Sequence, residues 1–191
     1  MKTTRSPVMH VALLRGINVG KAKRVAMADL RALCEALGYG DVKTLLNSGN
    51  VIFSAPRADA KAAARIQKEI ATRLGFSCRV LVLTATELDE IVAENPFAEG
   101  ETSPSRFLVT VLANASDRAR VESLAKQDWG TERLGVGSHA AYLWCPNGIL
   151  ESRAVLAISR LLGDAATNRN WATITKLHAL TRVSPAAIER R

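Results

Sequence analysis

The stretch DVKTLLNSGNVIFS, residues 41–54, decides how the chain can fold. Asp41 to Leu46 is predicted to be a strand, the four residues Asn47-Ser48-Gly49-Asn50 are a turn signal, and Val51 to Ser54 is the returning strand. The two strands therefore form a hairpin. A hairpin placed between two helices is typical of the split β-α-β unit.

The segments on either side of the hairpin complete that unit. His10 to Arg15 is a predicted strand, and apolar residues at helical spacing predict a helix from Met27 to Leu37. A second helix is predicted from Ala62 to Leu74, with glycines following both helices as natural stops. Ser77 to Leu83 is a fourth strand. The resulting order, β-α-β-β-α-β, is that of a ferredoxin-like half.

The same order then repeats with less regular sequence. The predicted elements are a linking helix at 84–97 capped by Thr86, a strand at 106–113, a helix opening at Ser116, a hairpin of 133–136 and 140–145, and a helix at 149–162. The eighth strand is missing or replaced by residues 165–171. A last helix is predicted at 173–181, and Ser184-Pro185 can start a terminal turn.

We therefore expect an α+β protein made of two tandem ferredoxin-like halves with antiparallel sheets and an extra C-terminal helix. The expected segments are half one at 1–83, a linking helix and loop at 84–105, a degenerate half two at 106–170, and a C-terminal helical segment at 171–191. Several strands are apolar on both faces, although helices cover only one side of a lone ferredoxin-like sheet. The second face is expected to be covered too, by sharing or stacking of the two sheets or by dimerisation.

Composition limits the class of protein. Of the residues, 48% are hydrophobic, which is enough for an ordinary core. No apolar run reaches the roughly 18 residues of a membrane helix, and the run from Val8 to Leu14 is too short for a secretory signal. A cytoplasmic location is the expectation. Three cysteines without C-x-x-C spacing predict buried free thiols rather than disulfides or a zinc site.

The net charge of +8 is concentrated at the two ends of the chain. Residues 1–40 carry seven Lys or Arg and two Asp or Glu, and residues 151–191 carry seven and three, whereas the middle is nearly balanced. A basic excess favours phosphate-bearing partners, although it also serves solubility alone.

The basic N-terminal part contains LLRGINVGKAKR, residues 13–24, which is close to a phosphate-binding loop. A P-loop needs four residues between its glycines and a Ser or Thr after the lysine, whereas Gly16 and Gly20 are separated by three and Ala22 follows Lys21. An ordinary P-loop is therefore excluded. Binding of another anion is still compatible with a strand, a glycine loop, basic residues and a helix start in this order.

The predicted fold gives this loop a neighbour. Strands one and three are adjacent in the usual order, so the hairpin turn is expected beside the loop after Arg15. The anion-binding candidates are Arg15, Gly16, Asn18, Gly20, Lys21, Lys23, Arg24, Asn47, Ser48 and Asn50. The alternative is that the glycines and asparagines serve turn geometry and the basic residues form a solvated rim.

A second candidate cluster follows the predicted eighth segment. It comprises Arg169, Asn170, Trp171, Thr173 and Lys176. A tryptophan beside Arg and Asn can stack on a base or sugar. It can equally anchor the core, with Asn170 or Thr173 as a helix cap.

Other types of site have little support. The histidines lack metal-ligand spacing, so no metal and no cofactor are expected. Ser48 lacks the surroundings of a nucleophile elbow, and no paired carboxylates or general base can be assigned. RNA-recognition domains share this element order but stack bases on sheet aromatics, of which strand three has only Phe53.

Several short motifs together resemble a known family. They are VALLRGINVG, SGNVIF, NPF, PNG and RNWATITKL, in this order over nearly the whole chain. This set resembles the bacterial proteins grouped as domain of unknown function 1697. The resemblance implies two ferredoxin-like halves and no established activity, substrate or cofactor. It also implies that Arg15, Gly16, Asn18, Gly20, Ser48, Gly49, Asn50, Arg169, Asn170, Trp171 and Thr173 are the family's recurring polar positions.

The sequence departs from the family pattern at two places. Lys21-Ala22 stands where a second glycine is expected after Gly20, and Ala172 stands where asparagine is common. The leading hypothesis is binding of a phosphorylated small molecule or nucleic acid at the Arg15–Arg24 and Asn47–Asn50 end of the sheet. An enzyme acting on a small phosphorylated or nucleotide-like substrate, and a module that dimerises through an apolar sheet face, are the alternatives. Whether the chain is an enzyme is left open.

Overall fold

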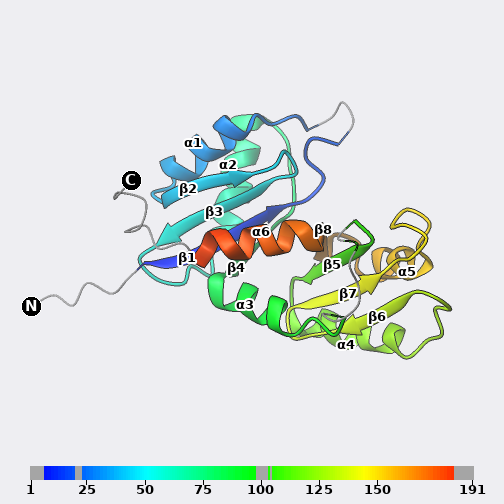
Figure 1. The fold of residues 1–191 in the computed structure, drawn as a ribbon. Coiled ribbons are helices and arrows are strands. Elements are labelled where there is room, and N and C mark those ends of the chain that lie inside the picture. The colour runs from blue at the N-terminus through cyan, green and yellow to red at the C-terminus, as the bar shows by residue number, and fades with distance from the viewer. Residues whose placement is uncertain (1–6, 20–22, 98–102, 104, 183–191) are drawn as a thin grey trace, which may run out of the picture. The chain divides into compact units, whose positions relative to one another are not determined.

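The computed structural model describes residues 7–19, 23–97, 103 and 105–182 (Figure 1). The chain divides into two compact units. The first unit comprises the residues up to Thr86 together with those from Ala179 onward, and the second unit is the continuous stretch Glu87–His178. Each unit contains one four-stranded antiparallel sheet, so the two halves do not share a sheet.

The first unit has the expected β-α-β-β-α-β order. Its elements are β1 (Val8–Leu14), α1 (Met27–Ala36), β2 (Gly40–Leu45), β3 (Asn50–Ala55), α2 (Ala62–Leu74) and β4 (Val80–Thr84). The strand order is β2-β3-β1-β4, which places β1 and β3 side by side. The predicted boundaries hold within a few residues, and α2 ends where Gly75 adopts a φ of 72°.

Alternation along the strands of the first sheet separates two buried faces. On one face Ala12, Leu14 and Phe53 pack with residues of α1 and α2, including Leu30 and Ile66. This is the ordinary core of a ferredoxin-like half. The opposite face carries Val11, Leu13, Ile52, Leu81 and Leu83, all of which are also buried. Burial on both faces explains why these strands read as continuous apolar runs.

The second unit repeats the order, preceded by α3. Its elements are α3 (Ala85–Ala93), β5 (Phe107–Leu112), α4 (Ala115–Ala125), β6 (Arg133–Val136), β7 (Ala140–Trp144), α5 (Arg153–Leu162), a short 3-10 turn (Gly163–Ala165), β8 (Ala166–Asn170) and α6 (Trp171–Arg182). The start of α3, up to Thr86, and the end of α6, from Ala179, belong to the first unit. The strand order is β6-β7-β5-β8. Of the two expectations for the eighth strand, its absence is wrong: within the segment 165–171 expected in its place, residues 166–170 form a strand that pairs with β5 along its length. The second half is therefore complete.

Helices cover both faces of the second sheet. One face packs on α4 and α5 through residues such as Leu108, Val121 and Ile158. On the other face, the Tyr142 hydroxyl donates to the Ile91 carbonyl of α3 at 2.7 Å, and Trp171 at the start of α6 stacks on Phe107 at 5.1 Å. The extra helices α3 and α6 thus shield the face that a lone ferredoxin-like half leaves exposed.

Two predicted helix starts are wrong. Thr86 does not cap the linking helix, because α3 begins at Ala85 and contains it. The helix predicted from Ile149 begins only at Arg153, because Ser152 is its N-cap and accepts from the Val155 N–H at 3.1 Å. The carboxylate of Glu132 adds two more bonds at this end, from the N–H groups of Arg153 and Ala154 at 3.0 and 3.1 Å.

This cap gives a prediction about pH. Burial raises the pKa of Glu132, but hydrogen bonds from Ser152 and the two N–H groups outweigh it and leave the pKa below its ordinary value. The lowered pKa means that the stabilisation is present above the unfolded-state pKa and is lost as the pH falls. We expect Glu132→Gln to lower the free energy of unfolding by about 1 kcal/mol at pH 7. Urea unfolding at pH 7 and pH 3.5 should show the difference shrinking at the lower pH; a constant difference would contradict it.

The two halves differ in one connection. Between β1 and α1 the chain runs through residues 15–26, whereas β5 and α4 are joined by Ala113 and Asn114 alone. Both connections link the first strand of a half to its first helix. The long connection contains the glycine loop singled out in the sequence.

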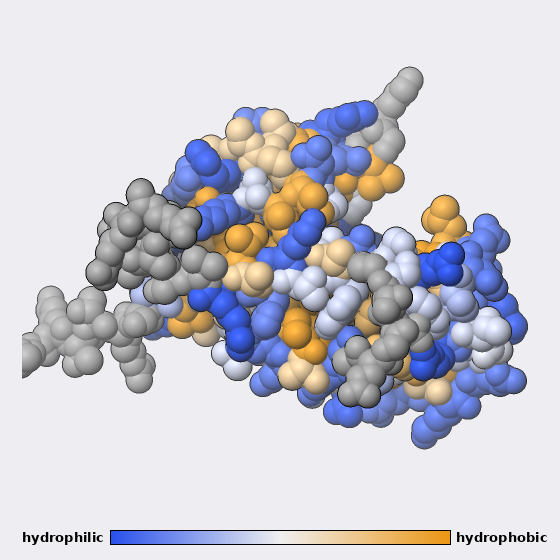
Figure 2. Space-filling view, viewed as in Figure 1, coloured by the Kyte–Doolittle hydropathy of each residue, from blue (hydrophilic) through white to orange (hydrophobic). Residues whose placement is uncertain are grey.

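Other expectations concern the chain as a whole. All three cysteines, Cys34, Cys78 and Cys145, are buried and free, as predicted. Burial raises the pKa of the Cys34 thiol to about 12. None of the helices in the described ranges combines the length and apolar character needed to cross a bilayer. Figure 2 shows a largely hydrophilic surface in this view, interrupted by hydrophobic residues.

Candidate functional site

The loop after β1 and the β2–β3 turn meet at one end of the first sheet, as the sequence predicts. Leu13 lies opposite Asn50 in the pairing of β1 with β3, and the Leu14 N–H donates to the Gly49 carbonyl at 2.8 Å. One step further along, the Asn18 side chain donates to the Asn47 carbonyl at 2.8 Å. The two segments therefore form a single surface, although they are far apart in sequence.

The Asn18 side chain joins three parts of this surface. Its Nδ2 donates to the carbonyls of Asn47 and Val25, and its Oδ1 accepts from the Val25 N–H at 2.8 Å. Its backbone has a φ of 56°, a left-handed conformation that asparagine tolerates better than most residues. Asn18 therefore ties the long loop to the start of α1 and to the hairpin, and its amide is already occupied.

Asn50 plays a comparable part inside the hairpin. Its side chain is fully buried, and its Nδ2 donates to the Leu45 carbonyl at 2.8 Å and to the Ser48 hydroxyl at 3.0 Å. A fully buried amide cannot touch a ligand at the surface. Of the predicted anion-binding amides, Asn18 and Asn50 thus shape the loops, and Asn47 remains exposed.

An open pocket of about 390 Å³ lies at this end of the sheet. Its lining comes from Asn18 and Asn47 and from the chain entering α1, Arg24-Val25-Ala26-Met27. The N-cap position of α1 is Ala26, which has no side-chain group to cap the helix. The first N–H groups of a helix and the positive end of its dipole attract anions. The pocket therefore combines a cation, an amide and a helix start.

Of the predicted cations in the described residues, Arg24 lines the pocket. Lys23, which precedes it in sequence, is exposed, and Arg15 is half-buried with its backbone N–H bonded to the Arg79 carbonyl at 2.8 Å. Gly16 is exposed and has a φ of 67°, which suits a glycine turn. Ser48 is exposed. Gly20 and Lys21 lie outside the described residues.

The acid nearest to the helix start in sequence is Asp29, in the first turn of α1. It is exposed and is not among the residues that line the pocket. A carboxylate in the first turn interacts favourably with the helix dipole and so competes with a bound anion for it. Ligand affinity at this site must therefore come from Arg24 and its neighbours as well as from the helix.

The second candidate cluster makes contacts of a different kind. Asn170 Oδ1 accepts from the N–H and the hydroxyl of Thr173, at 2.9 and 2.6 Å, and thereby caps α6. Trp171 stacks on Phe107. Arg169 is buried, and its guanidinium donates to the Thr167 hydroxyl and the Asn168 carbonyl. Burial lowers the pKa of Arg169 to about 10. Lys176 is exposed on α6.

These contacts are those of a helix cap, a half-buried aromatic that packs on β5 and a buried strand residue. Over the described residues, no group of three or more His, Cys, Asp or Glu side chains is placed to hold a metal ion. The pocket at the start of α1 is therefore the better candidate site.

Residues 8–142 match the family described as Protein of unknown function (DUF1697). The chain belongs to this family. The solved structure of the conserved bacterial protein SP0830 from Streptococcus pneumoniae is similar to it, with a TM-score of 0.77 and 19% sequence identity. That match covers 93% of this chain and 100% of the other. At this identity the likeness shows the fold alone. A comparison with curated proteins gave no match.

The family assignment says nothing about the pocket. Part of the pocket lining is not predicted from the sequence. Val25, Ala26 and Met27 line the pocket through the start of α1, although their side chains carry no polar group. The signal was available, because Ala26 directly before the helical pattern predicts a helix without a capping side chain. The exposed apolar residues Val19 and Leu46, 72% and 52% exposed, were also missed.

Proposed function

We propose that the protein binds a phosphate-bearing ligand at the pocket formed by the start of α1, Arg24 and Asn47. The observation that carries the proposal is the uncapped N-terminus of α1 at a pocket whose described lining includes a cation and no acidic side chain. Helix N–H groups and an arginine guanidinium both favour phosphate oxygens. The basic balance of residues 1–40 adds a long-range attraction for anions.

Asn18 and Asn50 act on this ligand only through the loops. Asn18 fixes the distance between Val25 and Asn47, two residues that line the pocket. Asn50 holds the turn that carries Asn47 and Ser48. A ligand would therefore meet a surface whose shape is set before binding, which lowers the entropic cost of binding.

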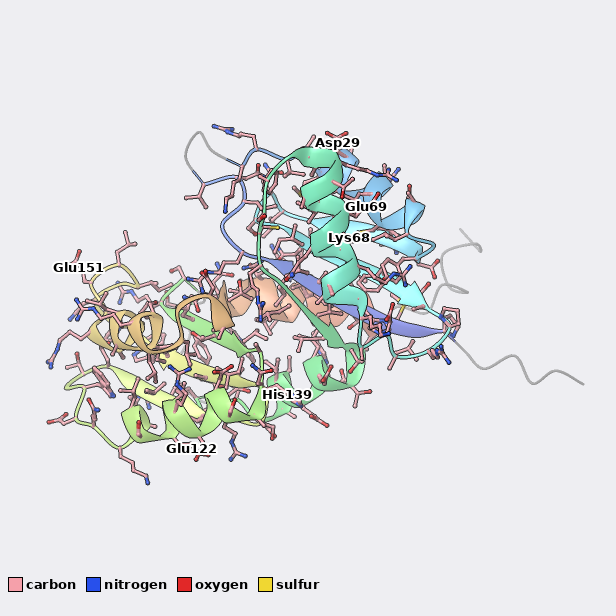
Figure 3. All side chains as sticks on the ribbon, turned by 180° about the vertical axis from the view of Figure 1, so that it is seen from behind. Asp29, Lys68, Glu69, Glu122, His139 and Glu151 are labelled. Carbon is pink, nitrogen blue, oxygen red and sulfur yellow. The ribbon has the colours of Figure 1, made fainter. Side chains whose placement is uncertain are left out.

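Calorimetric titration with pyrophosphate at low ionic strength tests the proposal. We expect Arg24→Gln to weaken binding about tenfold, because a charge-assisted hydrogen bond is lost. Lys68→Gln is the matched control: Lys68 is an exposed cation on α2, away from the pocket lining, and it is labelled in Figure 3. The control should bind as the unchanged protein does. Equal affinities for Arg24→Gln and the unchanged protein would refute the proposal.

A comparison of two probes distinguishes a small ligand from nucleic acid. A labelled single-stranded oligonucleotide, titrated by fluorescence anisotropy, should show a steep loss of affinity with salt if it is the ligand class. Pyrophosphate binding without oligonucleotide binding would identify a small phosphorylated molecule instead. Absence of binding by both probes at low salt would leave the pocket without an anionic ligand and contradict the proposed function.

A further inference from the structure

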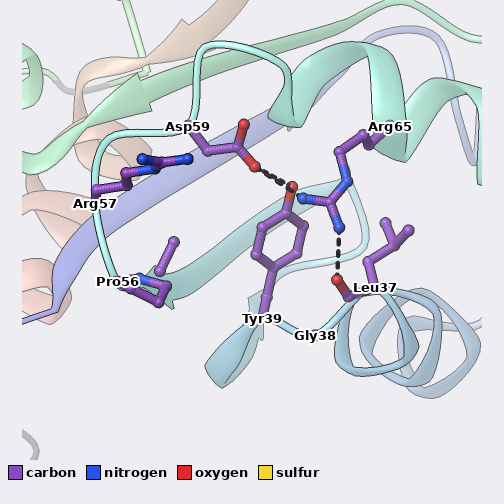
Figure 4. A pocket seen from close by; sticks show the side chains of 8 residues that line it. Leu37, Gly38, Tyr39, Pro56, Arg57, Asp59 and Arg65 are labelled. Atoms are coloured by element: carbon purple, nitrogen blue, oxygen red, sulfur yellow. Dashed lines mark hydrogen bonds and ion pairs between the residues drawn. The ribbon is translucent and has the colours of Figure 1, made fainter.

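A second cavity, of about 330 Å³, lies at the other end of the first sheet, where β1 begins and β3 ends. It is lined by Leu37, Gly38, Tyr39, Ala55, Pro56, Arg57, Asp59 and Arg65 (Figure 4). Its volume is at the lower end of the range of about 300–1,000 Å³ typical of small-molecule sites. None of the candidate residues derived from the sequence is among them.

A row of aromatic rings supports this cavity. Tyr39 packs on Phe53 with ring centroids 4.2 Å apart, and His10 stacks on Phe53 at 5.0 Å with an interplanar angle of 6°. Phe53 and His10 are buried in the core of the first unit. Tyr39 is therefore held by its ring, while its hydroxyl reaches the cavity.

Asp59 is fixed by hydrogen bonds of both its backbone and its carboxylate. Its backbone N–H donates to His10 Nε2 at 3.3 Å, and its Oδ1 accepts from the Lys61 N–H at 3.0 Å. Its Oδ2 accepts from the Tyr39 hydroxyl at 3.0 Å and from Arg65 Nη1 at 3.1 Å. Burial raises the pKa of Asp59, but these donors outweigh it and hold the pKa below its ordinary value. The carboxylate is ionised and already satisfied.

The side chain of Arg65 is also held in place by its contacts. Its Nη2 donates to the Leu37 carbonyl at 2.7 Å, and its guanidinium lies 5.2 Å from the centre of the Tyr39 ring. Burial and Asp59 raise the pKa of Tyr39 to about 12, so its hydroxyl stays protonated and donates a hydrogen bond to Asp59. The oxygen of that hydroxyl still has a lone pair for an outside donor.

The third charged residue of the lining, after Asp59 and Arg65, is Arg57. Within the part of the chain that the structure describes, its guanidinium makes no hydrogen bond and no ion pair. Figure 4 shows Arg57 and Arg65 on opposite sides of Tyr39. With Arg57 and Arg65 against Asp59 alone, the lining carries an excess positive charge. Planar guanidinium groups are suited to carboxylate and phosphate oxygens.

We propose that this cavity binds a small organic acid that carries a hydroxyl or amino group beside its carboxylate or phosphate. The anionic oxygens meet Arg57, Arg65 adds to the positive charge of the lining, and the neighbouring hydroxyl or amine donates to the Tyr39 oxygen. Asp59 takes no proton from the ligand; it positions Tyr39 and Arg65. This inference does not depend on the proposed function, because the two pockets share no residue.

NMR titration of the ¹⁵N-labelled chain tests the proposal with three probes: lactate, propionate and glycerol 3-phosphate. Lactate or glycerol 3-phosphate should shift the amide signals of Gly38, Tyr39 and Arg57. Lactate should bind more tightly than propionate, which lacks the hydroxyl. We expect Arg57→Gln to weaken binding about tenfold, whereas Lys68→Gln leaves it unchanged. If lactate binds more tightly than glycerol 3-phosphate, the site prefers a carboxylate; the opposite order shows that it prefers a phosphate.

A second variant tests whether the Tyr39 hydroxyl recognises the ligand or whether the arginines only attract its negative charge. Tyr39→Phe keeps the ring that packs on Phe53 and removes only the hydroxyl, so a dispersed spectrum is expected. In this variant lactate and propionate should bind alike. The proposal is overturned if no probe shifts these amides at tens of millimolar, or if Arg57→Gln titrates like the unchanged protein. It is overturned equally if lactate binds to the unchanged protein and propionate binds as tightly. The Arg24→Gln variant should leave these titrations unchanged, so failure here and failure of the first pocket are separate results.

Discussion

Replacing Gly49 by alanine is expected to lower the free energy of unfolding by about 3 kcal/mol. Gly49 has a φ of 76°, and a Cβ there would lie 2.8 Å from the Leu14 Cβ and 2.7 Å from the Ile17 Cδ1. The end of Ile17 can rotate away, but the Leu14 Cβ is fixed to the backbone of β1. The Gly49 carbonyl also accepts from the Leu14 N–H. β1 and the hairpin turn could therefore separate to make room for the Cβ only by weakening this hydrogen bond.

Gly75→Ala is the matched control for this effect. Gly75 has nearly the same φ, 72°, but a Cβ there would meet nothing within 4 Å. Its substitution should cost about 1 kcal/mol from backbone conformation alone. The shift of the urea unfolding midpoint measures both variants, and the difference between them isolates the steric contribution. Equal shifts would show that the contact between the loop and the hairpin can relax.

Asn50→Asp should have a comparable effect, about 3 kcal/mol at pH 7. The substitution keeps the shape of the side chain but replaces the donor Nδ2 with an anionic oxygen. That oxygen would face the Leu45 carbonyl and the Ser48 hydroxyl in a fully buried position. Because the Leu45 carbonyl can only accept, the buried charge would be repelled rather than paired.

This loss should depend on pH in a defined direction. Burial raises the pKa of the introduced carboxyl in the folded state, so the folded protein favours the protonated form. The protonated group can again donate to Leu45. Stability should therefore recover relative to the unchanged protein as the pH falls below that raised pKa. Asn47→Asp, an exposed change in the same turn, should shift the unfolding free energy by less than about 0.5 kcal/mol. If both variants behaved alike, burial of Asn50 would not be the cause.

The sequence predicts most of the fold because its stop and turn signals are local. Gly75 ends α2 through its own backbone conformation, and Asn47 to Gly49 form the turn of the hairpin. The start of α5 depends only in part on a local signal: Ser152 is its N-cap, but a second group that caps the helix is distant in sequence. Its capping carboxylate comes from Glu132, which approaches Ser152 only after the chain has folded.

β8 was missed for a related reason. Its sequence, ATNRN, has no apolar run, and its place in the sheet depends on backbone pairing with β5. Its polar side chains find partners there, as when the Thr110 hydroxyl donates to Asn168 at 2.9 Å. A strand defined by its neighbour leaves little trace in its own residues.

The candidate site was predicted in position but not in detail. Pairing of β1 with β3 follows from the order of elements, and it brings Asn18 and Asn47 together. Whether an amide points into the protein or toward solvent depends on register and loop conformation. Asn50 at the start of β3 is buried, whereas Asn47 in the adjoining turn is exposed. The Tyr39 cavity was missed because its residues are spread over 37–65 and form no motif.

The short connection through Ala113 and Asn114 shows what the architecture requires between the first strand of a half and its first helix. In the second half two residues are enough to join them. The connection at residues 15–26 is therefore longer than the architecture demands. Its extra length leaves room for residues whose role is not to connect a strand to a helix.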